Sequence, residues 1–144
     1  MTTRNSTFAD LYDVLDQPNL RPAREEGAKR LAELFPALSV LGLRRTGISF
    51  VPMFENKGTG KERTYHQLSS SEQQAFLAAF YTGKGPIFDS LLMIDAPELG
   101  FGDEGAVDLV QALLRWTTRT QIIVATASNA VRSMPETAHV VELP

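Results

Sequence analysis

The sequence predicts a single α/β domain in which a mainly parallel sheet is flanked by helices, with an antiparallel hairpin near residues 39–54. The chain has 144 residues, close to the roughly 150 typical of one domain. Two apolar runs, Ser90–Ile94 and Gln121–Thr126, have the composition of strands buried on both faces. A helical pattern separates them, so strand, helix and strand follow in the order that builds a parallel sheet.

The first part of the chain is expected to stand apart from this domain. Residues 1–22 are polar and contain two prolines, so they predict a short helix or an N-terminal arm. From Ala23 the apolar residues follow the i, i+3, i+4, i+7 spacing of one buried helix face, and Pro36 ends the helix. The domain is therefore placed at residues 23–144.

Two β-like runs follow this helix. Ser39–Leu43 and Gly47–Phe54 are expected to form the antiparallel hairpin, with the turn between them at residues 44–46. Residues 55–61 form a polar glycine loop, after which residues 61–66 return as a strand. The basic residues of this region are expected to be a solvated surface, with contact to an anionic partner as the alternative: Arg44, Arg45, Lys57, Lys61 and Arg63.

The remaining elements are marked by caps and periodicity. Ser69 and Glu72 have the spacing of a capping box and predict a helix beginning beside Ser69. Asp103 is expected to cap a third helix, which lies between the two apolar strands. Ala138–Leu143 predicts a further strand of the parallel sheet.

Composition excludes several classes of function. With 14 basic and 17 acidic residues, the formal net charge is −3, which argues against a broad nucleic-acid surface. The absence of cysteine excludes disulfides, thiolate nucleophiles and cysteine zinc sites, and two histidines are too few for a multi-histidine metal centre. The sequence has neither a signal peptide pattern nor an apolar run long enough for a membrane span, so a cytoplasmic location is expected.

Two segments stand where α/β proteins keep their chemistry, beyond the carboxyl ends of strands. Asp95 ends an apolar strand, and LSSSEQQ, residues 68–74, opens a helix. A helix N-terminus favours an anion through its unpaired N–H groups and its dipole. Asp95 is a ligand for Mg²⁺ if a phosphate lies nearby, and otherwise the polar terminus of a strand.

Together these segments resemble the carboxyl-terminal half of an ABC-type ATPase head of the RecF, SMC or OLD-like kind. LSSSEQQAFLAAF is similar to the signature motif and its helix, and LLMIDAPELGFGDEG to the Walker B strand and the D-loop. RTQIIVATASN, residues 119–129, resembles the next strand and its switch loop. The resemblance covers roughly residues 28–143 and implies a three-layer, P-loop-NTPase-like fold.

The resemblance also implies the site residues. The candidates for contact with a nucleotide are the residues of the signature-like turn: Ser69, Ser70, Ser71, Glu72 and Gln73. Asp95 is the candidate ligand for Mg²⁺, only if nucleotide is bound.

The sequence departs from the family pattern at its catalytic positions. Ala96 stands where the family has the glutamate that activates water, and Ala127 where it has the switch histidine. Ser71 occupies the signature glycine position and Gly102 the D-loop position. A missing general base typically costs ~10²–10⁴-fold in rate. We therefore assign no catalytic residue.

The nucleotide-gripping P-loop is also missing. The nearest pattern is ENKGTGKE, in which Glu55 stands at the position of the first glycine and Glu62 at that of the Ser or Thr. A P-loop is followed by a helix, but residues 61–66 are predicted to be extended. A solvated hairpin loop is therefore the expected structure of this segment.

These observations predict a catalytically degenerate ABC-ATPase-like protein that acts by association and is not an active ATPase alone. It would present the signature motif to a nucleotide held by a P-loop-bearing partner, which would supply ATP and Mg²⁺. The alternative is a protein-interaction module that has lost nucleotide binding. A homodimer is the other expected assembly, with nucleic acid contacted only indirectly. A third reading is a hydrolase that uses an acidic cluster: Asp95, Glu98, Asp103 and Glu104.

Overall fold

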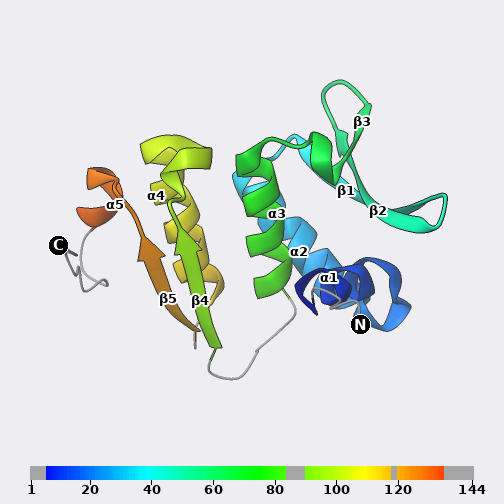
Figure 1. The fold of residues 1–144 in the computed structure, drawn as a ribbon, viewed down its shortest axis with the longest axis horizontal. Helices are drawn as coiled ribbons and strands as arrows, with labels where there is room; N and C mark the ends of the chain where they lie inside the picture. Colours follow the sequence, from blue (N-terminus) through cyan, green and yellow to red (C-terminus); the bar gives the residue numbers. More distant parts are fainter. Residues whose placement is uncertain (1–5, 84–89, 118–119, 135–144) are drawn as a thin grey trace. The chain divides into compact units, whose positions relative to one another are not determined.

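The computed structural model describes residues 6–83, 90–117 and 120–134, which fall into two compact units (Figure 1). Unit 1 is residues 1–87 and unit 2 is residues 88–144. The sequence had predicted one domain from residue 23 onward, with an appended N-terminal segment. The strand expected at Ala138–Leu143 lies outside the described residues.

Unit 1 joins helices to a small sheet. Its elements in chain order are α1 (Ser6–Asp16), η1 (Pro18–Leu20), α2 (Arg21–Leu34), β1 (Leu38–Thr46), β2 (Ser49–Asn56), β3 (Lys61–Thr64), η2 (Tyr65–Gln67) and α3 (Ser70–Thr82). The N-terminal segment therefore forms a helix, one of the two expected forms. Leu11, Val14 and Leu15 of α1 are buried, so this helix is part of the core of unit 1.

The expected hairpin is confirmed, with a different turn. β1 and β2 pair antiparallel, and β3 pairs antiparallel with β2. The turn lies at residues 47–48, because Gly47 has the positive φ of 62° that tight hairpin turns require. Arg44 and Arg45, expected in the turn, instead pair across the ladder with Val51 and Phe50.

Aromatic side chains hold the core of unit 1 together. The ring of Phe76 lies 5.0 Å from that of Phe54 and 4.8 Å from that of Phe80, measured between centroids, and all three side chains are fully buried. A Cβ atom on Gly27 would lie 2.8 Å from Phe80 Cγ. Glycine at this position therefore lets α2 pack closely on α3.

Unit 2 has the predicted order of strand, helix and strand. Its elements are β4 (Ser90–Asp95), α4 (Glu98–Trp116), β5 (Thr120–Ala125) and a short α5 (Asn129–Arg132). β4 and β5 pair in parallel, from Ser90 opposite Thr120 to Asp95 opposite Ala125. The parallel pair is confirmed, but the described residues of this unit contribute two strands rather than a larger sheet.

Helix α4 begins earlier than the sequence predicted. It starts at Glu98 rather than at Asp103, and Gly102 interrupts it with the non-helical angles φ 69° and ψ 176°. Pro97 precedes the first turn with φ −59°, an angle already suited to a helix. The glycine at the D-loop position thus joins two helical segments.

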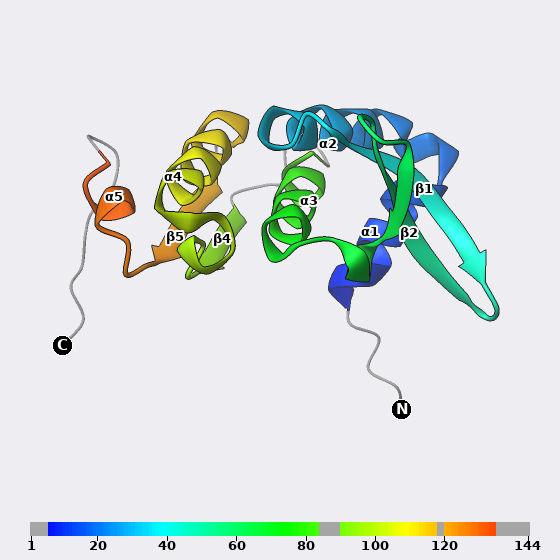
Figure 2. The same ribbon diagram turned by 90° about the horizontal axis from the view of Figure 1, so that it is seen from above.

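Among the described residues of unit 2, one face of the parallel pair is covered and the other is bare. α4 lies over one face (Figure 2), where Val124 packs against Ala106, Val110 and Val131. The expectation that both strands are buried on both faces is wrong, because the alternate residues Leu91, Met93 and Ile123 are exposed. A three-layer arrangement is not seen in the described part of the chain. None of the described helices has the length and hydropathy to cross a membrane.

Candidate functional site

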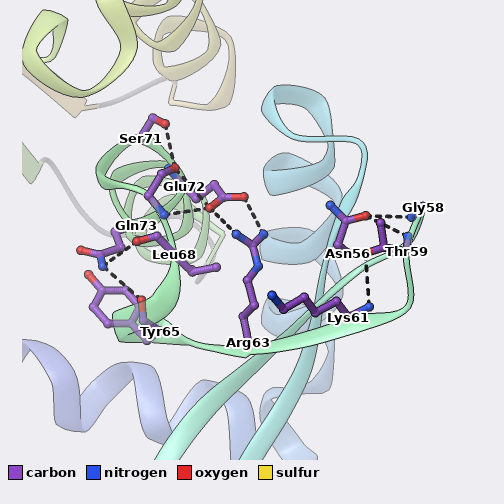
Figure 3. A network of polar contacts seen from close by, with 11 residues as sticks. Asn56, Gly58, Thr59, Lys61, Arg63, Tyr65, Leu68, Ser71, Glu72 and Gln73 are labelled. Carbon is purple, nitrogen blue, oxygen red and sulfur yellow. Dashed lines mark hydrogen bonds and ion pairs between the residues drawn. The ribbon is translucent and has the colours of Figure 1, made fainter.

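The serine-rich turn before α3 is a capped helix N-terminus, as the sequence predicted (Figure 3). The hydroxyl of Ser69 accepts a hydrogen bond from the Glu72 amide at 3.3 Å. The Glu72 carboxylate accepts in return from the Ser69 amide at 2.8 Å and from the Ser69 hydroxyl at 3.1 Å. This reciprocal pair of bonds fixes the conformation of the first turn.

Arg63 clamps the same carboxylate from strand β3. Its Nη2 lies 2.7 Å from Oε1 of Glu72, and its Nη1 lies 3.1 Å from Oε2 (Figure 3). Both side chains are largely shielded from solvent, with relative exposures of 22% and 14%. Two parallel charge-assisted bonds in such a place are strong and directional. The clamp therefore ties α3 to the sheet of unit 1.

The prediction of a solvated basic surface is correct for four of its five residues and wrong for Arg63. Arg44, Arg45, Lys57 and Lys61 are exposed. Arg63 is turned inward to Glu72, nine residues along the chain. A contact at that separation across a strand and a helix has no local sequence signature.

The five signature-like residues divide by what their side chains do. Gln73 donates from Nε2 to the carbonyl oxygens of Tyr65, at 3.1 Å, and Leu68, at 3.2 Å. Gln73 therefore joins Ser69 and Glu72 in building the turn. Ser70 is exposed and Ser71 is partly exposed, with the Ser71 hydroxyl 3.1 Å from that of Ser69. Ser69 is exposed as well, so all three serines reach the surface of the turn, and the side chains of Ser70 and Ser71 are not part of the capping bonds between Ser69 and Glu72.

Glu72 makes this turn sensitive to acid. Burial raises the pKa of Glu72. Hydrogen bonds from Arg63 and Ser69 and the positive charge of Arg63 lower the pKa by more, so that it lies below its ordinary value of 4.5. A folded-state pKa below the unfolded one gives stability that is present above the unfolded pKa. That stability is lost as the pH falls through the folded pKa.

Glu72→Gln is expected to make the free energy of unfolding of unit 1 depend less on pH under acidic conditions. Glutamine keeps the capping-box geometry but cannot titrate, so the variant is less stable than wild type near pH 7. Below about pH 4, which is under the usual glutamate pKa, the difference in the free energy of unfolding between wild type and variant should shrink. Urea unfolding from pH 7 to pH 3, followed by circular dichroism, measures it. A constant difference at every pH would contradict the assignment.

The second group of candidate residues lies at the carboxyl ends of β4 and β5. Asp95 is exposed at the end of β4. Ala96 follows with φ 45°, a left-handed conformation that non-glycine residues rarely adopt, and its amide donates to the Ala125 carbonyl at 2.8 Å. Neither Ala96 nor the exposed Ala127 carries a group that moves a proton.

Glu98 has a structural function that the sequence did not reveal. Its Oε2 accepts from the Thr126 hydroxyl at 2.7 Å and its Oε1 from the Ala127 amide at 2.8 Å. Hydrogen bonding by Thr126 and then by Ala127 lowers the pKa of Glu98. The carboxylate therefore stays ionised and braces the loop after β5 against the start of α4. A residue with both oxygens so engaged is poorly placed to act as a general base.

The acidic-cluster interpretation finds no support in the described residues. Residues 6–83, 90–117 and 120–134 contain no group of three or more histidine, aspartate or glutamate side chains that could hold a metal ion. Asp95 as a Mg²⁺ ligand remains a prediction.

The segment closest to a P-loop is a turn between antiparallel strands. Residues 57–60 connect β2 to β3, as the sequence predicted for a hairpin loop. The Asn56 side-chain oxygen accepts from the amides of Gly58, at 2.9 Å, and Thr59, at 3.2 Å (Figure 3). Amides that a phosphate would need are thus already bonded within the turn.

Solved structures show what this fold is similar to. No known family profile matches the sequence, and no curated protein matches it significantly. The Smc head domain of Pyrococcus yayanosii, with a coiled coil and joint, matches at 15% identity and a TM-score of 0.61, over 79% of this chain and 23% of that chain. An Smc head bound to the C-winged helix domain of ScpA matches at 14% identity and a TM-score of 0.62, over 84% of this chain and 42% of that chain.

A third match comes from structural work on ATP-driven dimerization and DNA-stimulated activation of SMC ATPases. Its identity is 15% and its TM-score 0.56, over 90% of this chain and 76% of that chain. The three matches indicate an SMC-head-like, ABC-ATPase-type fold, in agreement with the family resemblance of the motifs. This chain spans less than half the length of the first two matched chains.

Proposed function

We propose that this protein is a catalytically degenerate ABC-ATPase-like chain that acts by association and does not turn over ATP by itself. The SMC-head-like fold supports the ATPase-like part of this proposal. Alanine at positions 96 and 127 supports the degenerate part, because a methyl group can neither accept a proton nor bond a γ-phosphate. The engagement of Glu98 by Thr126 and Ala127 removes the nearest substitute base.

The finer proposal concerns the turn from Ser69 to Gln73. We propose that it is presented to a nucleotide held by a P-loop-bearing partner, with Mg²⁺ bound at the partner's phosphates. The observation that carries this proposal is that the side chains of Ser69, Glu72 and Gln73 hold the turn in shape together with Arg63. Ser70 is exposed and Ser71 is partly exposed. A preformed helix N-terminus with two displayed hydroxyls suits an anionic oxygen.

Ser71→Arg is expected to abolish ATP-dependent association with the partner. The long side chain would block the approach of phosphate to the turn, while Ser69 and Glu72 keep their capping bonds. The measurement is co-purification of the partner from the native cell with and without ATP and Mg²⁺. Circular dichroism verifies that the variant is folded.

Two matched variants sharpen this test. Ser71→Gly restores the residue that the family has at this position, so it should preserve or strengthen association. Gln111→Arg adds the same charge at an exposed position of α4 and should leave association unchanged. Association that stays ATP-dependent in Ser71→Arg would rule out contact of this turn with the nucleotide.

A second candidate function is an interaction module that no longer responds to nucleotide. The bare apolar face of β4 and β5, with Met93 71% exposed, favours it, because single domains rarely leave such a face uncovered. In that case the partner would co-purify equally with and without ATP.

A further inference from the structure

The hairpin of β1 and β2 ends in an exposed turn that carries large apolar side chains. Ile48 is 99% exposed and Phe50 is 54% exposed, and all of residues 44–50 lie at the surface. Both ribbon views show this end of the hairpin reaching beyond the helices of unit 1 (Figures 1 and 2). The name "hairpin tip" is used below for residues 44–50.

The geometry of the turn does not require isoleucine at position 48. Gly47 supplies the positive φ of 62° that the first position of such a two-residue turn needs. Turn positions are usually filled by glycine or by short polar residues such as asparagine, aspartate and serine. Because the side chain of Ile48 is almost wholly exposed, it gains nothing from packing in unit 1. Ile48 therefore adds apolar surface to the hairpin tip without helping the fold.

The charge of the hairpin tip is opposite to that of the whole chain. Residues 34–54 contain neither aspartate nor glutamate, and their only charged side chains are Arg44 and Arg45. The chain as a whole has a formal net charge of −3. Arg45 lies opposite Phe50 across the ladder, so these two side chains share one face of the hairpin. The hairpin tip thus combines apolar side chains with positive charge alone.

Both arginines are held in ways that leave them available to an anion. Arg45 donates from Nε to the Gly47 carbonyl at 3.1 Å, which keeps its guanidinium beside the turn. Arg44 lies 2.6 Å from a carboxylate oxygen of Glu62, and the two side chains are 54% and 45% exposed. An ion pair with this exposure contributes little to stability, so a phosphate can replace the carboxylate at low cost.

The size and chemistry of the hairpin tip favour one class of anionic partner. A stable protein interface takes about 20–30 residues from each side, whereas the hairpin tip has seven. A nucleic-acid backbone would pair with the arginines but leave Ile48 and Phe50 in water. An anionic lipid surface meets both needs, because its phosphates attract arginine and the boundary of its acyl chains takes up apolar side chains.

We propose that the hairpin tip docks on an anionic phospholipid surface. Ile48 and Phe50 enter the boundary between headgroups and acyl chains, and Arg44 and Arg45 bind the phosphates. A contact with so few apolar side chains is peripheral and reversible. It needs no nucleotide and uses none of the residues of the serine-rich turn, so it stands or falls independently of the proposed function.

Cosedimentation of the full chain with vesicles tests this docking. The protein should bind vesicles of phosphatidylcholine and phosphatidylglycerol in equal parts more strongly than vesicles of phosphatidylcholine alone, and salt should weaken the binding. Ile48→Asn keeps a residue suited to a turn and should lower the partition coefficient by about tenfold or more, because it removes a side chain that the lipid buries. Leu99→Asn is the matched control, since Leu99 is 85% exposed on α4, and should leave binding unchanged.

A second pair of variants tests the charge of the hairpin tip. Arg45→Gln should lower the partition coefficient for the mixed vesicles by about fivefold. Lys57→Gln is its control, because Lys57 is an exposed cation in the turn after β2, at the opposite end of that strand. Circular dichroism verifies that the four variants are folded.

Tryptophan fluorescence supplies an independent measurement of insertion. In Phe50→Trp, bromine atoms on the acyl chains should quench the added tryptophan, whereas wild type, whose one tryptophan is Trp116, should be quenched much less. Equal binding to both kinds of vesicle, or binding to neither, would overturn the inference. So would unchanged binding of Ile48→Asn, equal loss in Leu99→Asn, equal quenching in wild type, or stronger binding to double-stranded DNA than to the mixed vesicles.

Discussion

Phe76→Ala is expected to lower the free energy of unfolding of unit 1 by about 3–5 kcal/mol. Phe76 is 1% exposed and its ring contacts three others, with centroids 5.0 Å from Phe54, 4.8 Å from Phe80 and 5.9 Å from Tyr65. Removing the ring leaves a cavity where α3 meets the sheet, and the remaining aromatic rings can fill it only in part. A loss of this size approaches the whole stability of a small unit.

Urea unfolding monitored by tyrosine fluorescence and hydrogen exchange within residues 6–83 would measure this loss. Phe50→Ala is the matched control, because Phe50 is 54% exposed on the hairpin and its removal should cost under about 1 kcal/mol. Equal losses in the two variants would show that Phe76 is not at the centre of the core.

Local signals in the sequence predicted local structure well. The capping box of Ser69 and Glu72 depends on residues three apart, and the structure shows both of its hydrogen bonds. The hairpin and the strand–helix–strand order of unit 2 were predicted for the same reason, since periodicity and turn residues act within a few positions. The hairpin turn was misplaced because Gly47, rather than the arginines before it, supplies the positive φ.

The sequence did not predict the contacts between residues that lie far apart along the chain. Arg63 reaches Glu72 from another element, and Glu98 bonds groups 28 and 29 residues away. Neither partner can be chosen before the strands and helices are positioned. Both residues belong to the candidate sites, so sequence reasoning found the right segments but not the interactions that shape them.

Composition also misled the prediction of burial. After Ser90, every residue of the run to Ile94 is apolar, so both faces of the strand carry apolar side chains. This pattern is typical of a strand that is covered on both faces. Among the described residues of unit 2, only one of those faces is covered. An apolar sequence states that a face needs burial and does not state which polypeptide provides it.

The isolated chain is expected to hydrolyse no ATP above background, a deficit of at least ~10²–10⁴-fold from the missing general base alone. The loop nearest to a P-loop has its amides bonded to Asn56, so it offers phosphate few free donors. Ala96→Glu should not restore turnover, because a general base activates water for hydrolysis only beside a bound nucleotide. The residue at 96 also holds a left-handed φ of 45°, and glutamate would inherit that strain.

Phosphate release with ATP and Mg²⁺, measured on wild type, Ala96→Glu and Asp95→Ala, decides this point. All three proteins should give the same background rate, since trace contaminating ATPases do not depend on residues of this chain. Turnover that Asp95→Ala abolishes would place a working Mg²⁺ site at the end of β4 and contradict the degenerate assignment. A rate that rises only in Ala96→Glu would show that the chain still binds nucleotide and lacks only the general base. Equal rates in the three proteins, together with turnover on addition of the partner ATPase, would place the hydrolytic machinery in the partner.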